Sequence, residues 1–192
     1  KTEAAIPDLR TMLENTDDKN VRFAALDALA FMPTPETTPL FQGYLNDKET
    51  SMRASAALAL GRLQEVNYSG VLDPARQKEK NLSVRLALDF ALVAHGRMEY
   101  LDELVANLNS RIHVGEARPY LIELARGDAV RQALYPKLYS PDAEIRSNLC
   151  VVLAASGNSS SVSYLEVLLK DSDADVVAEA SRAIRILRSR GM

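Results

Sequence analysis

Hydrophobic and polar positions recur along the chain at a nearly constant spacing. Six aliphatic anchors are separated by 31, 32, 30, 31 and 31 residues. In five of the six copies, small or aliphatic residues follow at four, seven and eight positions after the anchor, and these offsets share one face of an α-helix. The anchors are Val21, Met52, Val84, Val114, Ile145 and Val176. A steady period over six copies is typical of a repeat protein.

Each period is long enough for two helices and a turn, which we call a hairpin with a first helix and a second helix. The anchors belong to the second helices. The six hairpins are expected at approximately residues 1–32, 33–64, 65–96, 97–126, 127–157 and 158–192. Because each hairpin can bury its apolar face only against its neighbours, we interpret residues 1–192 as one elongated all-α domain.

Prolines mark the places where the helices should deviate from this pattern. Pro74 predicts a short or broken first helix in the third hairpin, followed by a solvated loop at residues 76–80. Pro119 would break the interior of a helix, so the second helix of the fourth hairpin should begin late, near Gly115, or bend. Pro136 predicts a kink in the first helix of the fifth hairpin.

The repeated motif is clearest at residues 18–29, which read D-x-x-V-R-x-A-A-x-x-A-L. This motif, with its period, resembles the HEAT repeat, and it is most similar to the short bacterial repeats shared with phycobilisome lyase subunits. The resemblance implies a right-handed α-solenoid, an α-α superhelix of about six HEAT-like hairpins whose second helices line a concave surface. It also implies partner binding, usually of proteins, without naming the partner.

An arginine follows the anchor in four hairpins, with an acidic or amide residue four positions before it. These pairs are Asp18 with Arg22, Glu49 with Arg53, Asn81 with Arg85, and Asp142 with Arg146. An arginine at this spacing can pair with the acid on the same helix. We interpret the set as a structural ladder that fixes helix caps and hairpin spacing. A ligand-binding row of arginines is the alternative.

The second helices also carry residues that are expected to point away from the core, at two, five, six and nine positions after the anchor. Many are apolar, and an exposed apolar patch suggests a partner. The candidate partner-binding residues on the concave face are Phe23, Asp27, Leu58, Leu86, Phe90, Tyr120 and Arg182. The alternative is that tight curvature of the array buries these side chains against the next second helix.

Composition and isolated reactive residues point away from catalysis. The net charge of −3 and the lack of Trp disfavour nucleic-acid binding. His95 and His113 have no second histidine or carboxylate at ligand spacing, unlike the His-Glu pairs of the iron-binding deoxyhypusine hydroxylases, which are also HEAT proteins. Cys150 is expected to be a buried small hydrophobe. We therefore predict no catalytic residue, no metal and no cofactor.

The function that these observations favour is a non-enzymatic scaffold that binds a protein or peptide. A chaperone-like or lyase-type subunit that handles a cofactor or chromophore is the alternative, and nucleic-acid binding is a minor one. No run of about 18 apolar residues predicts a membrane span. A single cysteine favours the cytoplasm, but the chain begins at Lys1 without Met, so a periplasmic or anchored protein stays open.

Overall fold

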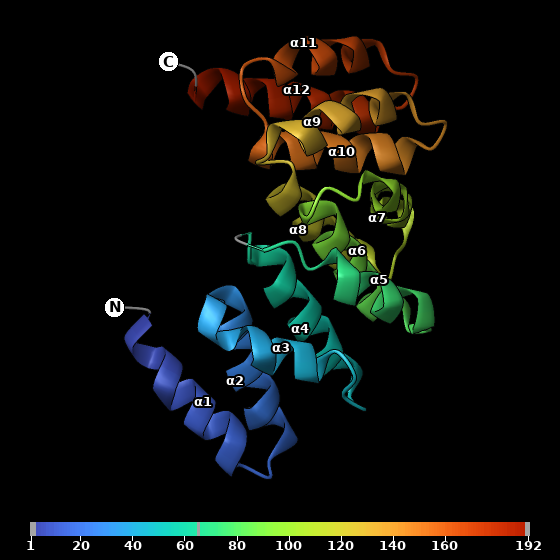
Figure 1. Ribbon diagram of the computed structural model, residues 1–192. Helices are drawn as coiled ribbons and strands as arrows, with labels where there is room; N and C mark the ends of the chain where they lie inside the picture. The colour runs from blue at the N-terminus through green and yellow to red at the C-terminus, as the bar shows by residue number, and fades with distance from the viewer. Residues whose placement is uncertain (1–2, 65, 191–192) are drawn as a thin grey trace. The chain divides into compact units, whose positions relative to one another are not determined.

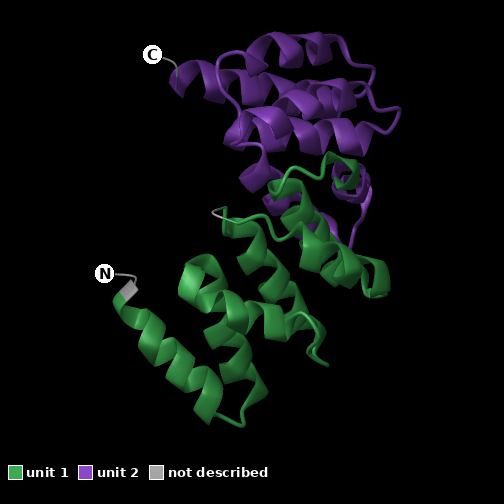
Figure 2. Cartoon of the chain, in the orientation of Figure 1, with its two compact units in different colours: residues 1–100 green, residues 101–192 purple. Residues whose placement is uncertain are grey.

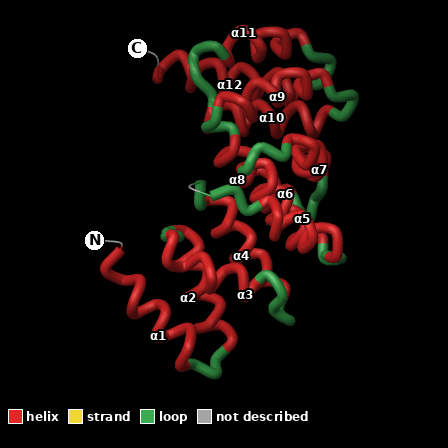
Figure 3. The backbone as a smooth tube through the Cα atoms, in the orientation of Figure 1, coloured by secondary structure: helices red, strands yellow, loops and turns green. Residues whose placement is uncertain are grey.

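A computed structural model describes residues 3–64 and 66–190 of the chain. These residues form α-helices and short 3-10 helices joined by turns, and they contain no strand (Figures 1 and 3). The all-α class that the sequence predicts is confirmed. None of the helices in the described ranges is long and apolar enough to cross a membrane.

The chain divides into two compact units, residues 1–100 and residues 101–192 (Figure 2). The described helices form three hairpins in each unit, in agreement with the repeat pattern and with an α-solenoid arrangement of hairpins. We describe the two units separately. A single continuous domain over all six hairpins stays a prediction.

Unit 1 contains the first three hairpins. The first helices are α1 (Ile6–Asn15), α3 (Thr38–Tyr44) and α5 (Ser69–Lys78), and the second helices are α2 (Lys19–Phe31), α4 (Thr50–Arg62) and α6 (Leu82–Ala94). The 3-10 turns η1 (Glu3–Ala5) and η2 (Pro35–Thr37) precede α1 and α3, and η3 (Met98–Tyr100) follows α6. Helix α4 packs against both α2 and α6, so the second helices form one layer (Figure 1).

Unit 2 repeats this organisation with shorter first helices. These are α7 (Leu101–Ala106), α9 (Asp128–Leu134) and α11 (Ser161–Glu166), each continued by a 3-10 turn, η4 (Asn107–Asn109), η5 (Tyr135–Tyr139) and η6 (Val167–Lys170) respectively. The second helices are α8 (Val114–Leu124), α10 (Ala143–Ser156) and α12 (Ala174–Arg190). Helix α10 packs against both α8 and α12.

The core of unit 1 includes the positions that the repeat pattern predicts. Leu29 and Leu60, eight residues after their anchors, are fully buried. The pattern predicts that the positions five and nine residues after an anchor point away from the core. This prediction is wrong in α2, because Leu26 and Ala30 are also fully buried. A second helix contacts its own first helix and the second helices beside it, so its buried face is wider than one amphipathic stripe.

Helices α4 and α6 approach each other closely at Gly61 of α4. A Cβ atom built on Gly61 would lie 2.7 Å from the Cα of Ala91 and 3.0 Å from the ring of Phe90, both on α6. Real Cβ atoms do not approach a backbone atom so closely. The glycine is therefore needed for the contact between α4 and α6, although glycine is a poor helix former.

The prolines break the helices less than the sequence predicts. Helix α5 continues through Pro74 to Lys78, so the expectation of a broken helix is wrong. The loop expected at residues 76–80 is confined to Glu79 and Lys80. Proline removes one backbone hydrogen bond from α5. The helix is held by side chains on both sides of it, because Leu72 is fully buried and Arg76 pairs with Asp89 of α6.

The other two prolines have different outcomes. Helix α8 begins at Val114, one residue before the predicted start, and it includes Pro119. Helix α9 ends at Leu134, and the chain continues as a 3-10 helix through Pro136. The predicted kink at Pro136 is therefore wrong, because the α-helix ends before this residue. Helices α7 and α11 also pass into 3-10 turns, and those turns contain no proline.

Candidate functional site

The acidic and amide ladder residues mainly cap the second helices. A carboxylate oxygen of Asp18 accepts hydrogen bonds from the backbone N–H groups of Asn20 at 2.8 Å and Val21 at 3.3 Å. Asp142 caps α10 in the same way, and the side chain of Asn81 accepts from the backbone N–H of Val84 at 3.2 Å. These caps satisfy backbone donors that have no partner within the helix.

The ladder arginines bind the following hairpin rather than the acid on their own helix. Arg53 donates two hydrogen bonds to the carboxylate of Glu79, at 2.7 Å and 3.1 Å. Arg146 donates two to Asp171, at 2.8 Å and 2.7 Å. Both acceptors lie five residues before the anchor of the next hairpin. For these two arginines the predicted pairing with Glu49 and Asp142 is wrong, and a contact with the next hairpin takes its place. A ladder over all four hairpins stays a prediction.

These two ladder pairs are well shielded and doubly bonded. The side chains of Arg53 and Glu79 are 18% and 9% exposed, and those of Arg146 and Asp171 are 11% and 7% exposed. Two parallel hydrogen bonds fix the orientation of the guanidinium as well as its position. The bond from Arg53 lowers the pKa of the Glu79 carboxyl, and the bond from Arg146 lowers that of Asp171.

The first ladder arginine, Arg22, has a different environment. Its guanidinium donates to the hydroxyl of Tyr44 at 3.4 Å, a long hydrogen bond. The residue that corresponds to Glu79 and Asp171 is Asp47, and its carboxylate accepts the backbone N–H of Glu49 at 2.8 Å. Within the described part of the chain, Arg22 has no carboxylate at ion-pair distance. The remaining ladder arginine, Arg85, is half-buried on α6.

Arg22 lines a pocket of about 360 Å³ between the N-terminal ends of α2 and α4. Phe23, one of the candidate partner-binding residues, also lines this pocket and is 38% exposed. Glu49 accepts a hydrogen bond from Lys19 at 2.9 Å across its rim. The remaining lining residues are Asp17, Asn20, Lys48, Ser51 and Met52. Apolar and charged groups therefore meet at one edge of unit 1.

The structure divides the candidate partner-binding residues of unit 1 into accessible and buried ones. Phe23 is exposed, and Asp27 and Leu58 are half-buried, with Asp27 accepting a hydrogen bond from Ser55 of α4 at 3.0 Å. Leu86 and Phe90 are 0% and 1% exposed, so their assignment to a partner-binding surface is wrong.

The burial of Phe90 has a local cause. Its ring occupies the space beside Gly61 that a larger side chain on α4 would fill. Leu86 lies one helical turn before Phe90 on the same stripe of α6. Phe90 therefore packs against the preceding second helix, α4, whereas the alternative named the following second helix. The other two candidates lie in unit 2, where Tyr120 is half-buried and Arg182 is exposed.

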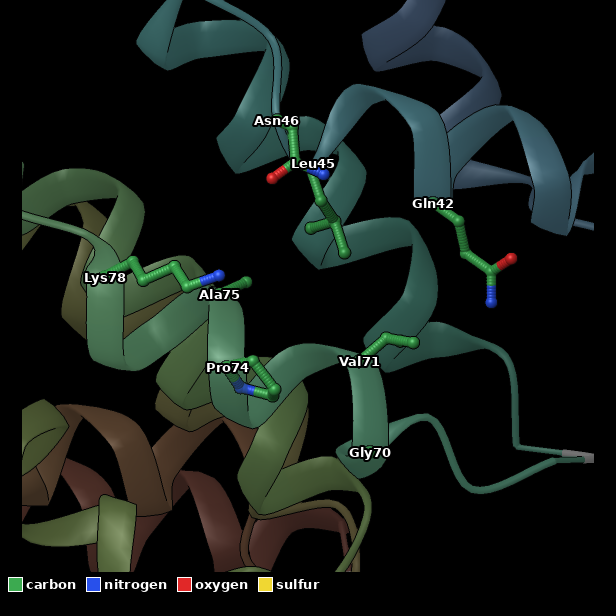
Figure 4. Close-up of a pocket in the computed structure, with 8 residues that line it drawn as sticks. All are labelled: Gln42, Leu45, Asn46, Gly70, Val71, Pro74, Ala75 and Lys78. Atoms are coloured by element: carbon green, nitrogen blue, oxygen red, sulfur yellow. The ribbon is translucent and has the colours of Figure 1, made fainter.

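A second pocket, of about 350 Å³, lies between the first helices α3 and α5 (Figure 4). Leu45 and Asn46, just after α3, face Val71, Pro74 and Ala75 of α5 across it, and Gln42, Gly70 and Lys78 complete the lining. The sequence pattern did not predict this pocket, because a loop was expected over part of α5. It lies on a different face of unit 1 from Phe23, since first helices form it.

Side chains near the ends of some second helices contact backbone carbonyl groups of the preceding second helix, which the sequence pattern did not predict. Arg62 of α4 donates to the backbone carbonyl of Ala30 at 2.9 Å, and the Nε2 atom of His95 lies 2.9 Å from the carbonyl oxygen of Leu60. In unit 2, Arg190 of α12 donates to the carbonyl of Ala154 at 2.8 Å. Donors near the end of one helix thus cap the preceding second helix, and basic residues near helix ends are the sequence signal.

The remaining reactive residues have local contacts. The Nδ1 atom of His113 lies 3.1 Å from a carboxylate oxygen of Glu116, so the prediction that this histidine has no carboxylate nearby is wrong. His113 is the N-cap residue of α8, and Glu116 lies three positions later in the first turn of the helix. The described residues contain no group of three or more His, Cys, Asp or Glu side chains placed to hold a metal ion.

Cys150 is fully buried on α10, as predicted. Burial raises the pKa of its thiol from the ordinary value of 9.0 to about 12. At pH 8 the thiolate population should then be roughly a thousandfold lower than that of an exposed thiol. We expect the folded chain to react with a disulfide reagent far more slowly than the chain in urea, measured by thiolate release. Rapid stoichiometric labelling of the folded chain would show that α10 opens or that the thiol is accessible.

Comparisons with known proteins agree with the repeat interpretation. A family model described as HEAT repeats matches residues 6–93, which include α1 to α5 and nearly all of α6. No curated protein matches the chain. The similar solved structures include two engineered proteins and human deoxyhypusine hydroxylase in complex with glycerol.

These structural likenesses are distant. The first engineered protein is 19% identical with a TM-score of 0.45, covering 96% of both chains. The hydroxylase is 20% identical with a TM-score of 0.47, covering 97% of this chain and 75% of its own. The second engineered protein is 20% identical with a TM-score of 0.42, covering 95% and 99%. They carry no argument about function, and the sequence match supports HEAT repeats over residues 6–93, slightly less than half of the chain.

Proposed function

We propose that the protein is a non-enzymatic scaffold that binds a protein or peptide on the second-helix surface of unit 1. We define this surface by Phe23, Asp27 and Leu58, on the adjacent helices α2 and α4. The observation that carries the proposal is the exposure of Phe23 beside a pocket. Partly exposed aromatic side chains beside a pocket are typical anchors of protein interfaces, because they bury a large apolar area with little loss of conformational freedom.

The proposal of a non-enzymatic role rests on what the reactive side chains do. The Cys150 thiol is buried and remains protonated at neutral pH. His95 contacts the carbonyl of Leu60 and the ring of Tyr68. Both contribute to the packing of hairpins, and we assign neither of them to chemistry on a substrate.

The test is partner capture with a surface variant and a matched control. We expect the double variant Phe23→Glu and Leu58→Glu to lose a partner that the wild-type chain captures from a source-cell lysate, because two added charges would have to be buried in the interface. The control is Val71→Glu on α5, where the side chain is 41% exposed on the first-helix face. Captured proteins are identified by mass spectrometry, and circular dichroism checks that each variant is folded.

The control determines how the result is interpreted. A protein retained by Val71→Glu and lost by the double variant supports the second-helix surface. A partner captured equally by the wild-type chain and the double variant contradicts it. Loss by Val71→Glu alone would place binding on the first helices.

A further inference from the structure

Two of the ladder arginines each bind a carboxylate of the next hairpin. Arg53 and Arg146 follow the anchors of their hairpins, and each guanidinium holds one carboxylate through two hydrogen bonds. The carboxylates belong to Glu79 and Asp171, on the turns of the next hairpins. This chain therefore provides two internal examples of an arginine at this position binding a carboxylate with bidentate geometry.

Among the described residues, Arg22 occupies the same position in the first hairpin without a carboxylate at ion-pair distance, although the negative charges of Asp47 and Asp17 act on it. Its guanidinium donates the long hydrogen bond to Tyr44, and the side chain lines the open pocket between α2 and α4. Asp47, which corresponds to Glu79 and Asp171, caps the turn before α4. The pocket thus presents a guanidinium where the second and fifth hairpins hold a guanidinium with its carboxylate.

The surroundings of Arg22 suit a carboxylate on an apolar segment. Lys48 is exposed on the rim, and Lys19 is 70% exposed although it pairs with Glu49. Asp17 is the remaining acidic side chain of the lining. The first turn of α4 has no side-chain cap, so its backbone donors and helix dipole favour a negative group. Phe23 supplies an apolar contact at the same pocket.

We propose that this pocket binds a glutamate or aspartate side chain of an acidic, partly apolar segment of the partner protein. The partner's carboxylate takes the place at Arg22 that Glu79 and Asp171 take at their arginines. An adjacent apolar side chain of the partner contacts Phe23. This inference rests on the proposed function and assigns the chemistry of the partner at one end of the second-helix surface.

The test uses a terminally blocked peptide of alternating glutamate and leucine, with a glutamine–leucine peptide of the same length as its control. The isotopically labelled full chain is titrated, and the Arg22 side-chain Nε–Hε signal and the Phe23 ring signals are followed by NMR. We expect saturable shifts with the acidic peptide only. Arg22→Gln should weaken binding by about tenfold or more, and Arg10→Gln, on the exposed face of α1, should leave it unchanged.

Two results would overturn the inference. One is equal binding of the acidic peptide to the wild-type chain and to folded Arg22→Gln, or no shift at Arg22. The other is a large shift of the Arg22 signal on changing Asp47→Asn without peptide, which would show that Asp47 is the carboxylate that Arg22 binds in solution.

Failure of this inference can be told apart from failure of the proposed function. If the lysate partner is lost by the double variant of Phe23 and Leu58 but kept by Arg22→Gln, the second-helix surface stands and the carboxylate site is wrong. If the double variant keeps the partner, the proposed surface itself is wrong. The peptide titration reports on Arg22 in either case.

Discussion

Replacing Arg76 with methionine should lower the free energy of unfolding by about 3–5 kcal/mol, the usual cost of removing one partner from a buried ion pair. The guanidinium of Arg76 donates to both carboxylate oxygens of Asp89, and the side chains are 14% and 0% exposed. The variant keeps most of the side-chain volume but removes the charge that faces the Asp89 carboxylate. Urea denaturation followed by circular dichroism measures the change.

Two controls separate charge from packing in this experiment. Lys78→Met, at the exposed end of the same helix α5, should change stability by less than about 0.5 kcal/mol. The double variant Arg76→Met and Asp89→Leu should recover much of the loss, because both buried charges are then absent. A single Arg76→Met variant as stable as the wild type would contradict the assignment of this pair as a stabilising contact between α5 and α6.

Enlarging Gly61 should destabilise unit 1 even though it improves helix propensity. Gly61→Ala would gain up to about 1 kcal/mol from propensity alone. The added Cβ, however, would lie 2.7 Å from the Cα of Ala91, so α4 and α6 must separate. Overpacking of this kind costs about 1–3 kcal/mol, and Gly61→Val should cost more than Gly61→Ala.

The matched control for Gly61 is Gly43→Ala in α3, where an added Cβ meets nothing within 4 Å. We expect this variant to be as stable as the wild type or more stable. Thermal unfolding of the three variants in parallel gives the comparison. If Gly61→Ala and Gly43→Ala shift the melting temperature equally and upward, the close approach of α4 and α6 is not a constraint in solution.

The repeat period predicted the fold well because it depends on many positions at once. The anchors and the order of the hairpins follow from a pattern that recurs in every copy. The errors lie where one hairpin differs from the others. Pro74 does not break α5, because Leu72 and Arg76 hold the helix through contacts with residues outside it.

The candidate site could be predicted only in part, because exposure depends on neighbouring hairpins. Phe23 and Phe90 were both expected on the concave face, but Phe90 fills the space beside Gly61 while Phe23 lines a pocket. The ladder residues were identified from spacing, whereas their partners depend on the path of the next turn. Spacing within one helix cannot show that Arg53 reaches Glu79, 26 residues further along the chain.

The most direct test of the scaffold account is photo-crosslinking from the proposed surface. A benzophenone amino acid is placed at position 23 or, as a control, at position 71, and the full chain is irradiated in source-cell lysate. The account predicts one dominant crosslinked protein from position 23, suppressed by excess unlabelled wild-type chain and absent from position 71. The same crosslinked protein from both positions, or from position 71 alone, would contradict binding on the second-helix surface.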